Sequence, residues 1–293
     1  MKILLTGGSG FIGKNIRESY LGEKHQIIAP SRSELDCFND QSVEHFLSRN
    51  SFDVIIHSAA KPGHRNALDT KGILYSNSRM IVNLLKYQGS WGKFINMGSG
   101  GIYDAVHYLP KMKEEYFGTH IPEDEPGYTK YLMGLIFPKY PNTIDFRIFG
   151  IYGKYEDYAI RFISNAICKA IFDLPITIRQ NRKFDYLHVD DLAPIVDHFI
   201  LNQAKDQAYN ITPPRSIELL QLAALIRNIS GKKIDILVAN EGMGMEYSGD
   251  NTRLITELGQ VTFTPIEKGV SSLYEWYQAN KANLDIKKLF TDK

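Results

Sequence analysis

The first residues, MKILLTGGSGFIG, restrict the fold more than any other part of the chain. A short apolar run over Lys2–Thr6 is typical of a buried strand, and Gly7, Gly10 and Gly13 follow it. Glycines here allow a tight turn and let a pyrophosphate approach the backbone, while the following helix offers free N–H groups to an anion. The pattern predicts a dinucleotide-binding strand–turn–helix unit, with a turn that binds nothing as the lesser alternative.

Apolar runs and amphipathic stretches alternate through the first half of the chain. Strands are expected at 26–29, 53–57, 93–97 and 143–148, and helices at 11–21, 42–48, 77–87 and 128–137. The strands are continuously apolar rather than alternating, which is typical of a parallel sheet with helices on both faces. We therefore expect an α/β fold with a Rossmann-type, doubly wound parallel sheet.

The pattern changes after about residue 150. Short strands at 175–178, 184–189 and 234–238 mix with helices at 160–172, 192–202, 216–229 and 270–280. We expect residues 1–155 to form the dinucleotide-binding domain and 156–293 to form mostly a smaller, mixed substrate domain. Some segments, such as 184–202, should return to the first domain. The 293 residues of the chain are enough for two such parts.

The composition argues against several other classes of protein. The 34 Lys and Arg residues nearly balance 33 Asp and Glu, without the basic surplus of a protein that binds nucleic acid or anionic lipid. The initial apolar run is too short for a signal peptide, and no stretch approaches the roughly 20 apolar residues of a membrane span. Cys37 and Cys168 show no metal-type spacing. We expect no metal site and a cytoplasmic location, where thiols stay reduced.

The end of the second expected strand bears on the choice of cofactor. In IIAPSRSELD, residues 27–36, no acid stands at the strand end to bind a ribose 2′-hydroxyl, whereas Ser31 and Arg32 suit a 2′-phosphate. Asp36 is expected either to lie near the adenine or to be a turn residue. The sequence therefore favours NADP(H) over NAD(H). The alternative that Arg32 is an ordinary solvated loop residue stays open.

Seven segments together resemble the extended short-chain dehydrogenase/reductase family, in particular its NAD(P)-dependent nucleotide-sugar epimerases, dehydratases and reductases. They are TGGSGFIG at 6–13, HSAAK at 57–61, NSRMIVNLL at 77–85, INMGSGGIYD at 95–104, GYTKY at 127–131, FRIFGIYG at 146–153 and FDYLHVDDLA at 184–193. The resemblance implies an enzyme that binds a nicotinamide dinucleotide and a nucleoside-diphosphate sugar.

The resemblance also implies roles for single residues. Ser99, four residues before Tyr103, matches the catalytic serine, whose hydroxyl would hydrogen-bond the substrate oxygen. Lys130 matches the lysine that binds the nicotinamide ribose and lowers a tyrosine pKa. Cofactor contacts are implied for Gly7, Gly10, Phe11, Ile12, Gly13, Ala59, Ala60, Lys61, Asn77, Phe149 and Gly150, and substrate contacts for Ser99, Gly100, Tyr103 and Arg182.

The family's Tyr-x-x-x-Lys signature is incomplete in DEPGYTKYLMG, residues 124–134. Pro126 stands four residues before Lys130, and leucine stands four residues after Tyr128. In a helix, Tyr128 lies about 200° from Lys130 and cannot share its face, but a helix that starts late would leave Tyr128 free. Three readings stay open: Tyr128 or Tyr103 replaces the acid, Ser99 acts with an ordered water, or the fold binds its ligands without redox chemistry.

The residues around Ser99 limit the reactions that we expect the chain to catalyse. The AAK and HVDD pieces are similar to the GDP-fucose synthase branch of the family. That branch pairs reduction with epimerisation and uses a cysteine and a histidine as acid and base. In this chain the place of the cysteine is taken by Gly101, and the place of the histidine falls near Phe162. A 4,6-dehydratase would have an acidic pair at Gly100 and Gly101. We predict a reductase of a nucleoside-diphosphate-4-keto-6-deoxysugar, as used in deoxysugar and polysaccharide biosynthesis. An epimerase and a catalytically impaired binding protein remain alternatives.

Two further expectations concern the partners of the chain. Four arginines are candidate ligands of the substrate diphosphate, and Arg182 is favoured among Arg161, Arg182, Arg215 and Arg253. A homodimer is expected through the helices at 77–87 and 128–137, whose apolar faces could equally pack on the sheet.

Overall fold

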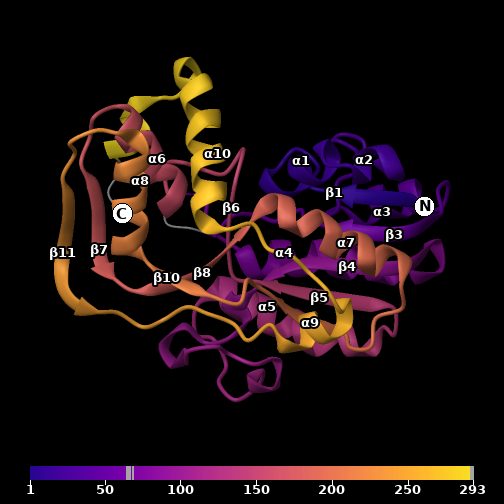
Figure 1. Ribbon diagram of the computed structural model, residues 1–293. Coiled ribbons are helices and arrows are strands. Elements are labelled where there is room, and N and C mark those ends of the chain that lie inside the picture. The colour runs from indigo at the N-terminus through magenta and orange to yellow at the C-terminus, as the bar shows by residue number, and fades with distance from the viewer. Residues whose placement is uncertain (64–66, 68, 291–293) are drawn as a thin grey trace.

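The computed structural model describes residues 1–63, 67 and 69–290, and its main feature is a six-stranded sheet (Figure 1). The sheet has the order β2-β1-β3-β4-β5-β9, and every neighbouring pair is parallel. Its strands are β1 (Lys2–Thr6), β2 (Gln26–Ile28), β3 (Phe52–His57), β4 (Trp91–Ser99), β5 (Thr143–Ile148) and β9 (Ala208–Ile211). The strand order reverses between β1 and β3, which is where ligands of such sheets bind.

Helices cover both faces of this sheet. They are α1 (Phe11–Glu18), α2 (Leu21–Lys24), α3 (Asp40–Leu47), α4 (Ile73–Lys86), α5 (Glu125–Ile136), α7 (Leu192–Leu201) and α9 (Thr252–Leu258). Ile16 of α1 and Phe199 of α7 are buried in one core, and Leu84 of α4 and Met133 of α5 in another on the opposite face. The expected doubly wound parallel sheet is confirmed, although the helix expected over 11–21 is divided into α1 and α2.

A second, smaller part lies beside the sheet, on the left of Figure 1. It contains β6 (Gly150–Tyr152), β7 (Ile176–Asn181), β8 (Lys183–His188), β10 (Ser216–Glu218), β11 (Ile236–Met243), α6 (Phe162–Ile171), α8 (Leu219–Ser230) and α10 (Ile266–Ala279). Strands β10, β8 and β6 form one small sheet, and β11 pairs with β7 in another. The core of this part contains one fully buried residue from each helix: Ile167 of α6, Leu222 of α8 and Val270 of α10. No helix in the described residues is long and apolar enough to cross a membrane.

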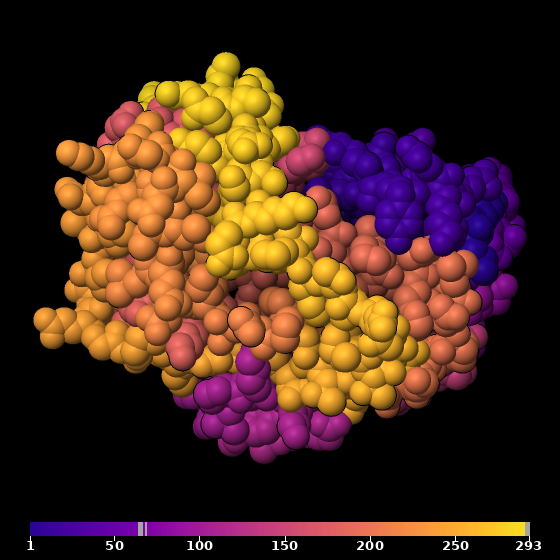
Figure 2. Space-filling model, viewed as in Figure 1, coloured from indigo at the N-terminus to yellow at the C-terminus, as the bar shows by residue number. Residues whose placement is uncertain are grey.

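The chain passes between the two parts more than once. After β8, α7 packs on the large sheet and β9 extends it. After β11, α9 contacts β9 before the chain reaches α10. Figure 2 shows the connection from α9 to α10 as a yellow segment that crosses the junction. Neither β9 nor α9 was expected from the sequence, and together they bring C-terminal residues to the edge of the large sheet.

The start of α5 differs from its expected position. The helix begins at Glu125, and the carboxylate of Asp124 caps it by accepting from the Gly127 N–H at 2.8 Å. Pro126 lies in the first turn, where its missing N–H removes no helical hydrogen bond. The late start considered from the sequence is therefore wrong, and Tyr128 is helical.

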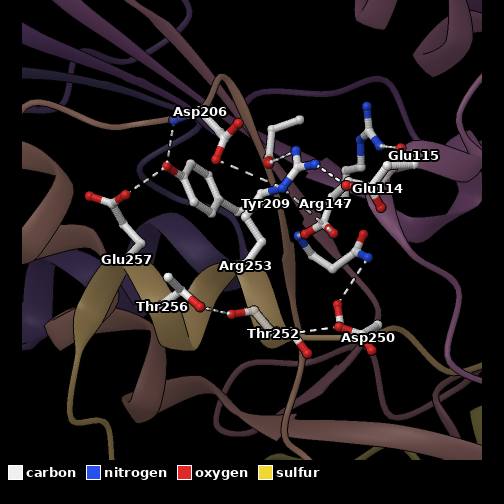
Figure 3. Close-up of polar contacts among 12 residues, drawn as sticks. Glu114, Glu115, Arg147, Asp206, Tyr209, Asp250, Thr252, Arg253, Thr256 and Glu257 are labelled. Carbon is white, nitrogen blue, oxygen red and sulfur yellow. Dashed lines mark hydrogen bonds and ion pairs between the residues drawn. The ribbon is translucent and has the colours of Figure 1, made fainter.

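A polar network fixes the long connection between β4 and α5 to the edge of the sheet (Figure 3). Glu114 Oε1 accepts from the backbone N–H of Asn210 at 2.7 Å, and the Glu114 carbonyl accepts from Arg147 at 3.1 Å. Arg253 of α9 donates to the carboxylate of Glu115. The connection is thereby tied to β5, β9 and α9, so the chain that leaves the end of β4 has a fixed path.

Candidate active site

The turn between β1 and α1 requires glycine at two of the predicted positions. Gly7 has a φ of +71°, and a Cβ there would lie 2.6 Å from the Ala59 nitrogen. A Cβ on Gly13 would lie 2.2 Å from the Gly7 oxygen, so α1 packs directly on the turn. Gly10 is the N-cap of α1 and supplies no side-chain cap, and the first turn contains no acidic residue. The free N–H groups and the positive end of the helix dipole therefore suit a pyrophosphate.

Two adjoining cavities form a trough along the carboxyl edge of the sheet. The first, of about 510 Å³, extends from the glycine turn to the end of β2, and the second, of about 670 Å³, extends from the turn to α5. Among the predicted residues, Ala59, Ala60 and Lys61 line both cavities; Gly7, Ser31, Arg32 and Asp36 line the first; Gly10, Phe11, Ile12, Asn77, Ser99 and Lys130 line the second. An extended dinucleotide would place its adenosine half in the first cavity and its nicotinamide half in the second.

Asn77 of α4 fixes the chain segment that both cavities share. Its Oδ1 accepts from the Lys61 backbone N–H at 2.7 Å, and its Nδ2 donates to the Lys61 carbonyl at 3.1 Å. The Lys61 ammonium donates to Asp69 at 2.6 Å. These contacts hold the segment after β3 in place and so position Ala59 and Ala60 along the trough.

The adenosine end of the trough carries two oppositely charged side chains, Arg32 and Asp36. The side chain of Arg32 is 82% exposed and lies 3.6 Å from the Asp36 carboxylate. The Glu34 carboxylate accepts from the backbone N–H of Ser31 at 2.7 Å and from its hydroxyl at 2.8 Å, and these bonds lower the pKa of Glu34. Glu34 was not expected from the sequence, because it lies several residues beyond the end of β2. The Glu34 carboxylate accepts from both hydrogen-bond donors of Ser31. Of Ser31 and Arg32, Arg32 is therefore the better placed to contact a 2′-phosphate.

Ser99 and Lys130 both line the second cavity, and both lie close to Gly101. Ser99 ends β4, and its Oγ accepts from the Gly101 N–H at 3.1 Å. A Cβ on Gly101 would lie 3.4 Å from Ser99 Oγ and 3.9 Å from Cδ and Cε of Lys130, so both side chains border the same space. Lys130 Nζ donates to the Pro126 carbonyl at 2.9 Å. Burial lowers the pKa of Lys130, and nearby carboxylates oppose this effect.

The two tyrosines considered as replacement acids lie elsewhere. Pro126 lines the cavity at the position of the family's tyrosine. Tyr128 is 36% exposed, and its ring faces another tyrosine of α5. Tyr103 is buried, its hydroxyl donating to Asn210 Oδ1 at 2.8 Å and accepting from Arg147 at 2.9 Å, and burial raises its pKa to about 12. Neither tyrosine lines the cavity.

A different tyrosine reaches the end of β4. Tyr247 follows β11 in the chain. Its hydroxyl lies 2.8 Å from the point that a Cβ on Gly100 would occupy, and its ring packs on Phe149 at 4.9 Å between centroids. Gly100 and Phe149, for which ligand contacts were expected, thus lie against this tyrosine. No local pattern in GMEYSGD, residues 244–250, marks Tyr247, because the contact joins segments far apart in the chain.

A buried carboxyl in the cavity wall was also missed. Asp145 of β5 lines the second cavity and accepts from Asn96 Nδ2 at 2.7 Å. Burial raises the pKa of Asp145, which the neighbouring Arg147 opposes. A Cβ on Gly98 would lie 2.6 Å from Asp145 Oδ1, so glycine at 98 makes room for the carboxyl. The available signal was a lone acid in the otherwise buried strand TIDFRI, since such a charge is rarely buried without a partner.

The remaining predicted ligands lie outside the trough. Gly150 packs on β8, where a Cβ would lie 2.1 Å from the Asp185 carbonyl oxygen. Arg182 lines a separate hollow between β7 and β8. Of the other arginines considered, Arg161 at the start of α6 lines the second cavity, whereas Arg253 belongs to the network of Figure 3. Within the described residues, no cluster of His, Cys, Asp or Glu could hold a metal ion.

A doubly wound sheet with an uncapped glycine turn beside a two-chambered trough is the architecture of the dinucleotide-binding class of α/β proteins. The chain belongs to the NAD-dependent epimerase/dehydratase family, whose model matches residues 3–212. The resemblance to extended short-chain dehydrogenases/reductases that act on nucleotide sugars is thereby confirmed. Gly7, Gly10 and Gly13 are the residues whose geometry fits the cofactor's pyrophosphate.

The similarity to known proteins extends over nearly the whole chain. The chain is 23% identical to GDP-L-colitose synthase of Yersinia pseudotuberculosis, over 97% of this chain and 100% of that protein. Its fold matches a GDP-6-OMe-4-keto-L-xylo-heptose reductase of Campylobacter jejuni with a TM-score of 0.82 at 19% identity, covering 95% and 98% of the two chains. A GDP-mannoheptose C4 reductase of the same organism, with NADP bound, has a TM-score of 0.80 at 21% identity, covering 94% and 98%.

Proposed function

We propose that this protein is an NADPH-dependent reductase of the 4-keto group of a nucleoside-diphosphate-4-keto-6-deoxysugar. The observation that carries the proposal is that Ser99 and Lys130 border one cavity that continues to the glycine turn. A carbonyl placed between them would meet a hydroxyl donor on one side and a positive charge on the other. The relatives described above, which are nucleotide-sugar synthases and reductases, support the same class of reaction.

Each residue of the cavity then has a chemical task. Ser99 would donate a hydrogen bond to the carbonyl oxygen and stabilise the negative charge that develops there. Lys130 would bind the nicotinamide ribose and add a positive charge nearby. Bound NADPH would supply a hydride to the carbonyl carbon. The product oxygen also needs a proton, which Pro126 cannot give, so the proton must come from water or from another group at the cavity.

The surroundings of Ser99 favour reduction without epimerisation or dehydration. Both of those reactions move a proton at a carbon beside the carbonyl and therefore need an acid or base at that point. Gly100 and Gly101 provide neither, and Phe162 lines a different hollow. An epimerase is consequently the weaker candidate.

The substrate we propose first is a GDP-linked sugar, because the three relatives above are named for GDP sugars. Arg161 brings a positive charge from the second part of the molecule into the cavity, where a guanidinium suits a diphosphate. Arg182 remains a proposed contact farther along, at a hollow of about 410 Å³.

For the cofactor we propose NADP(H) in preference to NAD(H), because the exposed Arg32 lies at the adenosine end of the trough. We also propose a cytoplasmic homodimer. Helices α4 and α5 lie side by side, and Val82 and Leu135 on them are 43% and 47% exposed. Such an apolar surface on paired helices suits a second copy of the chain.

The test uses the purified protein, NADPH and a panel of GDP-, dTDP- and CDP-linked 4-keto-6-deoxysugars. Loss of the reduced-nicotinamide absorbance with one of these sugars supports the proposal and identifies the base. Binding of NADPH without its oxidation by any member of the panel would overturn the proposal. That result would favour the second candidate, a protein that binds cofactor and sugar nucleotide but has lost its chemistry through Pro126.

A further inference from the structure

A row of buried polar side chains crosses four neighbouring strands of the large sheet. Thr6 of β1 pairs with His57 of β3, and His57 pairs with Asn96 of β4. Asn96 in turn pairs with Asp145 of β5. The four residues are 3%, 3%, 8% and 4% exposed, in strands whose interior positions are otherwise mostly apolar. Buried polar groups need hydrogen-bond partners, so the row requires an explanation.

The row is bonded at both ends and open in the middle. Thr6 Oγ1 lies 2.8 Å from His57 Nδ1, and Asn96 Nδ2 donates to Asp145 Oδ1 at 2.7 Å. Among the described residues, no protein group bonds to His57 Nε2 or to Asn96 Oδ1, although the two residues are neighbours across the strands. His57, Asn96 and Asp145 all line the second cavity, so the open part of the row belongs to its wall.

The hydroxyl of Thr6 indicates which nitrogen of His57 carries the hydrogen. Thr6 Oγ1 accepts from the Ala59 N–H at 3.4 Å, so its own hydrogen can be donated to His57 Nδ1. Burial lowers the pKa of His57 to about 4, so the ring is neutral at neutral pH and has its one hydrogen on Nε2. A donor on His57 thus stands next to an acceptor, Asn96 Oδ1. Because neighbouring strands are about 4.8 Å apart, one water molecule fits between the two groups.

We propose that His57 and Asn96 are positioning residues that bind a water molecule in the second cavity, and that this water replaces the tyrosine lost at Pro126 as proton source. The inference rests on the reductase function proposed above. The water would accept from His57 Nε2–H and donate one hydrogen to Asn96 Oδ1, which leaves its second hydrogen for a ligand. Pro126 lines the same cavity, and its ring is smaller than a tyrosine side chain, which leaves volume for the water.

The proton balance needs only solvent. The carbonyl carbon of the sugar gains a hydride from the reduced nicotinamide, and the carbonyl oxygen gains the second hydrogen of the water as a proton. The hydroxide that remains keeps its bonds to His57 and Asn96, and the ammonium of Lys130, which lines the same cavity, stabilises its charge. Solvent returns a proton to the hydroxide as the alcohol leaves. One ketone, one hydride and one solvent proton thus become one alcohol.

The first test compares two substitutions of the same histidine. His57→Leu removes the donor to the water, and we expect kcat to fall roughly 10- to 100-fold while KM for the sugar and Kd for NADPH stay within about twofold. The solvent deuterium isotope effect on kcat should increase, because proton delivery becomes slower. His57→Gln keeps an N–H donor of similar reach and should restore most of kcat.

Thr143→Val controls for the loss of a buried polar group from the same sheet. The Thr143 hydroxyl donates to the carbonyls of Phe137 and Tyr140, and Thr143 does not line the second cavity. We expect this variant to keep the kcat and the solvent isotope effect of the wild type. A His57→Leu protein with unchanged kcat, or His57→Gln and His57→Leu proteins with equal losses, would overturn the inference alone.

Two measurements on the ligand-free protein test the water site without turnover. Nitrogen NMR shifts of the His57 ring should show a hydrogen on Nε2 and none on Nδ1 at neutral pH. A crystal structure should show a water within hydrogen-bond distance of both His57 Nε2 and Asn96 Oδ1. A hydrogen on Nδ1, or no water at this place, would overturn the inference and leave the proposed function standing. A wild-type protein that oxidises no NADPH with any sugar would overturn the proposed function, and the role of the water as proton source with it.

Discussion

The glycine turn, which we propose as the cofactor half of the trough, and the residues around Ser99 and Lys130, which we propose as its reaction half, are built in different ways. The cofactor half depends on backbone: Gly7 and Gly13 make the turn, and α1 presents its free N–H groups. The reaction half depends on side chains that come from separate segments, with Ser99 on β4, Lys130 on α5 and Arg161 at the start of α6. The first half follows its family's pattern closely, whereas the second lacks the family's tyrosine.

The difference shows where such a site can change. A Cβ on Gly13 would lie 2.2 Å from the Gly7 carbonyl oxygen, so the turn has no space for a side chain at this position. A hydroxyl donor, in contrast, can be supplied from any segment that reaches the same point. Loss of tyrosine at Pro126 therefore need not end the chemistry, provided that another group stands beside Ser99.

The largest effect is expected from Gly13→Ala, which breaks the cofactor half. The added Cβ would meet the backbone oxygen of Gly7, and neither atom can move without opening the turn. We predict that NADPH binding weakens by more than roughly 100-fold, measured by fluorescence titration. Gly89→Ala is the control, because a Cβ there meets nothing within 4 Å. Unchanged NADPH affinity in a folded Gly13→Ala protein would contradict the assignment of the turn.

The next largest effect concerns the reaction half. Ser99→Ala removes the hydroxyl that we place on the carbonyl oxygen, and kcat should fall by about 100- to 1000-fold. NADPH affinity should change less than about twofold, because the cofactor half is untouched. The exposed Ser48 gives a matched control in Ser48→Ala. A Ser99→Ala protein that keeps most of its kcat would show that the serine does not contact the reacting oxygen.

The smaller part of the molecule and the trough should also differ in their response to pH. Burial raises the pKa of Glu156, between β6 and α6, to about 8, and Ser164 Oγ lies 2.5 Å from its carboxyl. The folded protein keeps this proton while the unfolded chain loses it near pH 4.5, so the stability that Glu156 provides is complete below that pH and is lost as pH rises through 8.

The melting temperature of the wild type should therefore fall between about pH 5 and pH 9. In Glu156→Gln this fall should be smaller by about 5 °C. Differential scanning calorimetry at the two pH values provides the measurement. In the second cavity of the trough, burial lowers the pKa of His57 to about 4, well below this range. We accordingly expect NADPH affinity to stay flat above pH 7. Equal pH dependence in Glu156→Gln and wild type would argue against a buried proton at this residue.

The smallest effect is expected at the adenosine end. Arg32→Ala removes the exposed guanidinium that we assign to the 2′-phosphate, and KM for NADPH should rise about 10-fold while KM for NADH stays the same. Arg49→Ala, at another exposed arginine, serves as the control. Equal changes with both cofactors would mean that Arg32 does not distinguish them.

The features that could be predicted from the sequence are those with local causes. Strands β1 and β5 have their expected bounds, because each is a continuous apolar run between polar segments. The glycine turn was predictable for the same reason, since its residues are neighbours in the chain. Strand β9 is only four residues long and is defined by its pairing with β5, so its own pattern carries little information. Tyr247 and Asp145 likewise acquire their positions from contacts between distant segments.

The most direct test of the central claim follows the hydride itself. The protein would be incubated with NADPH deuterated at the transferable position of the nicotinamide and with the 4-keto sugar that consumes it, and the product would be analysed by mass spectrometry and NMR. The account predicts one deuterium, attached to C4 of the reduced sugar. A product without deuterium at C4, or deuterated NADPH recovered intact with every sugar, would contradict the assignment of this trough to carbonyl reduction.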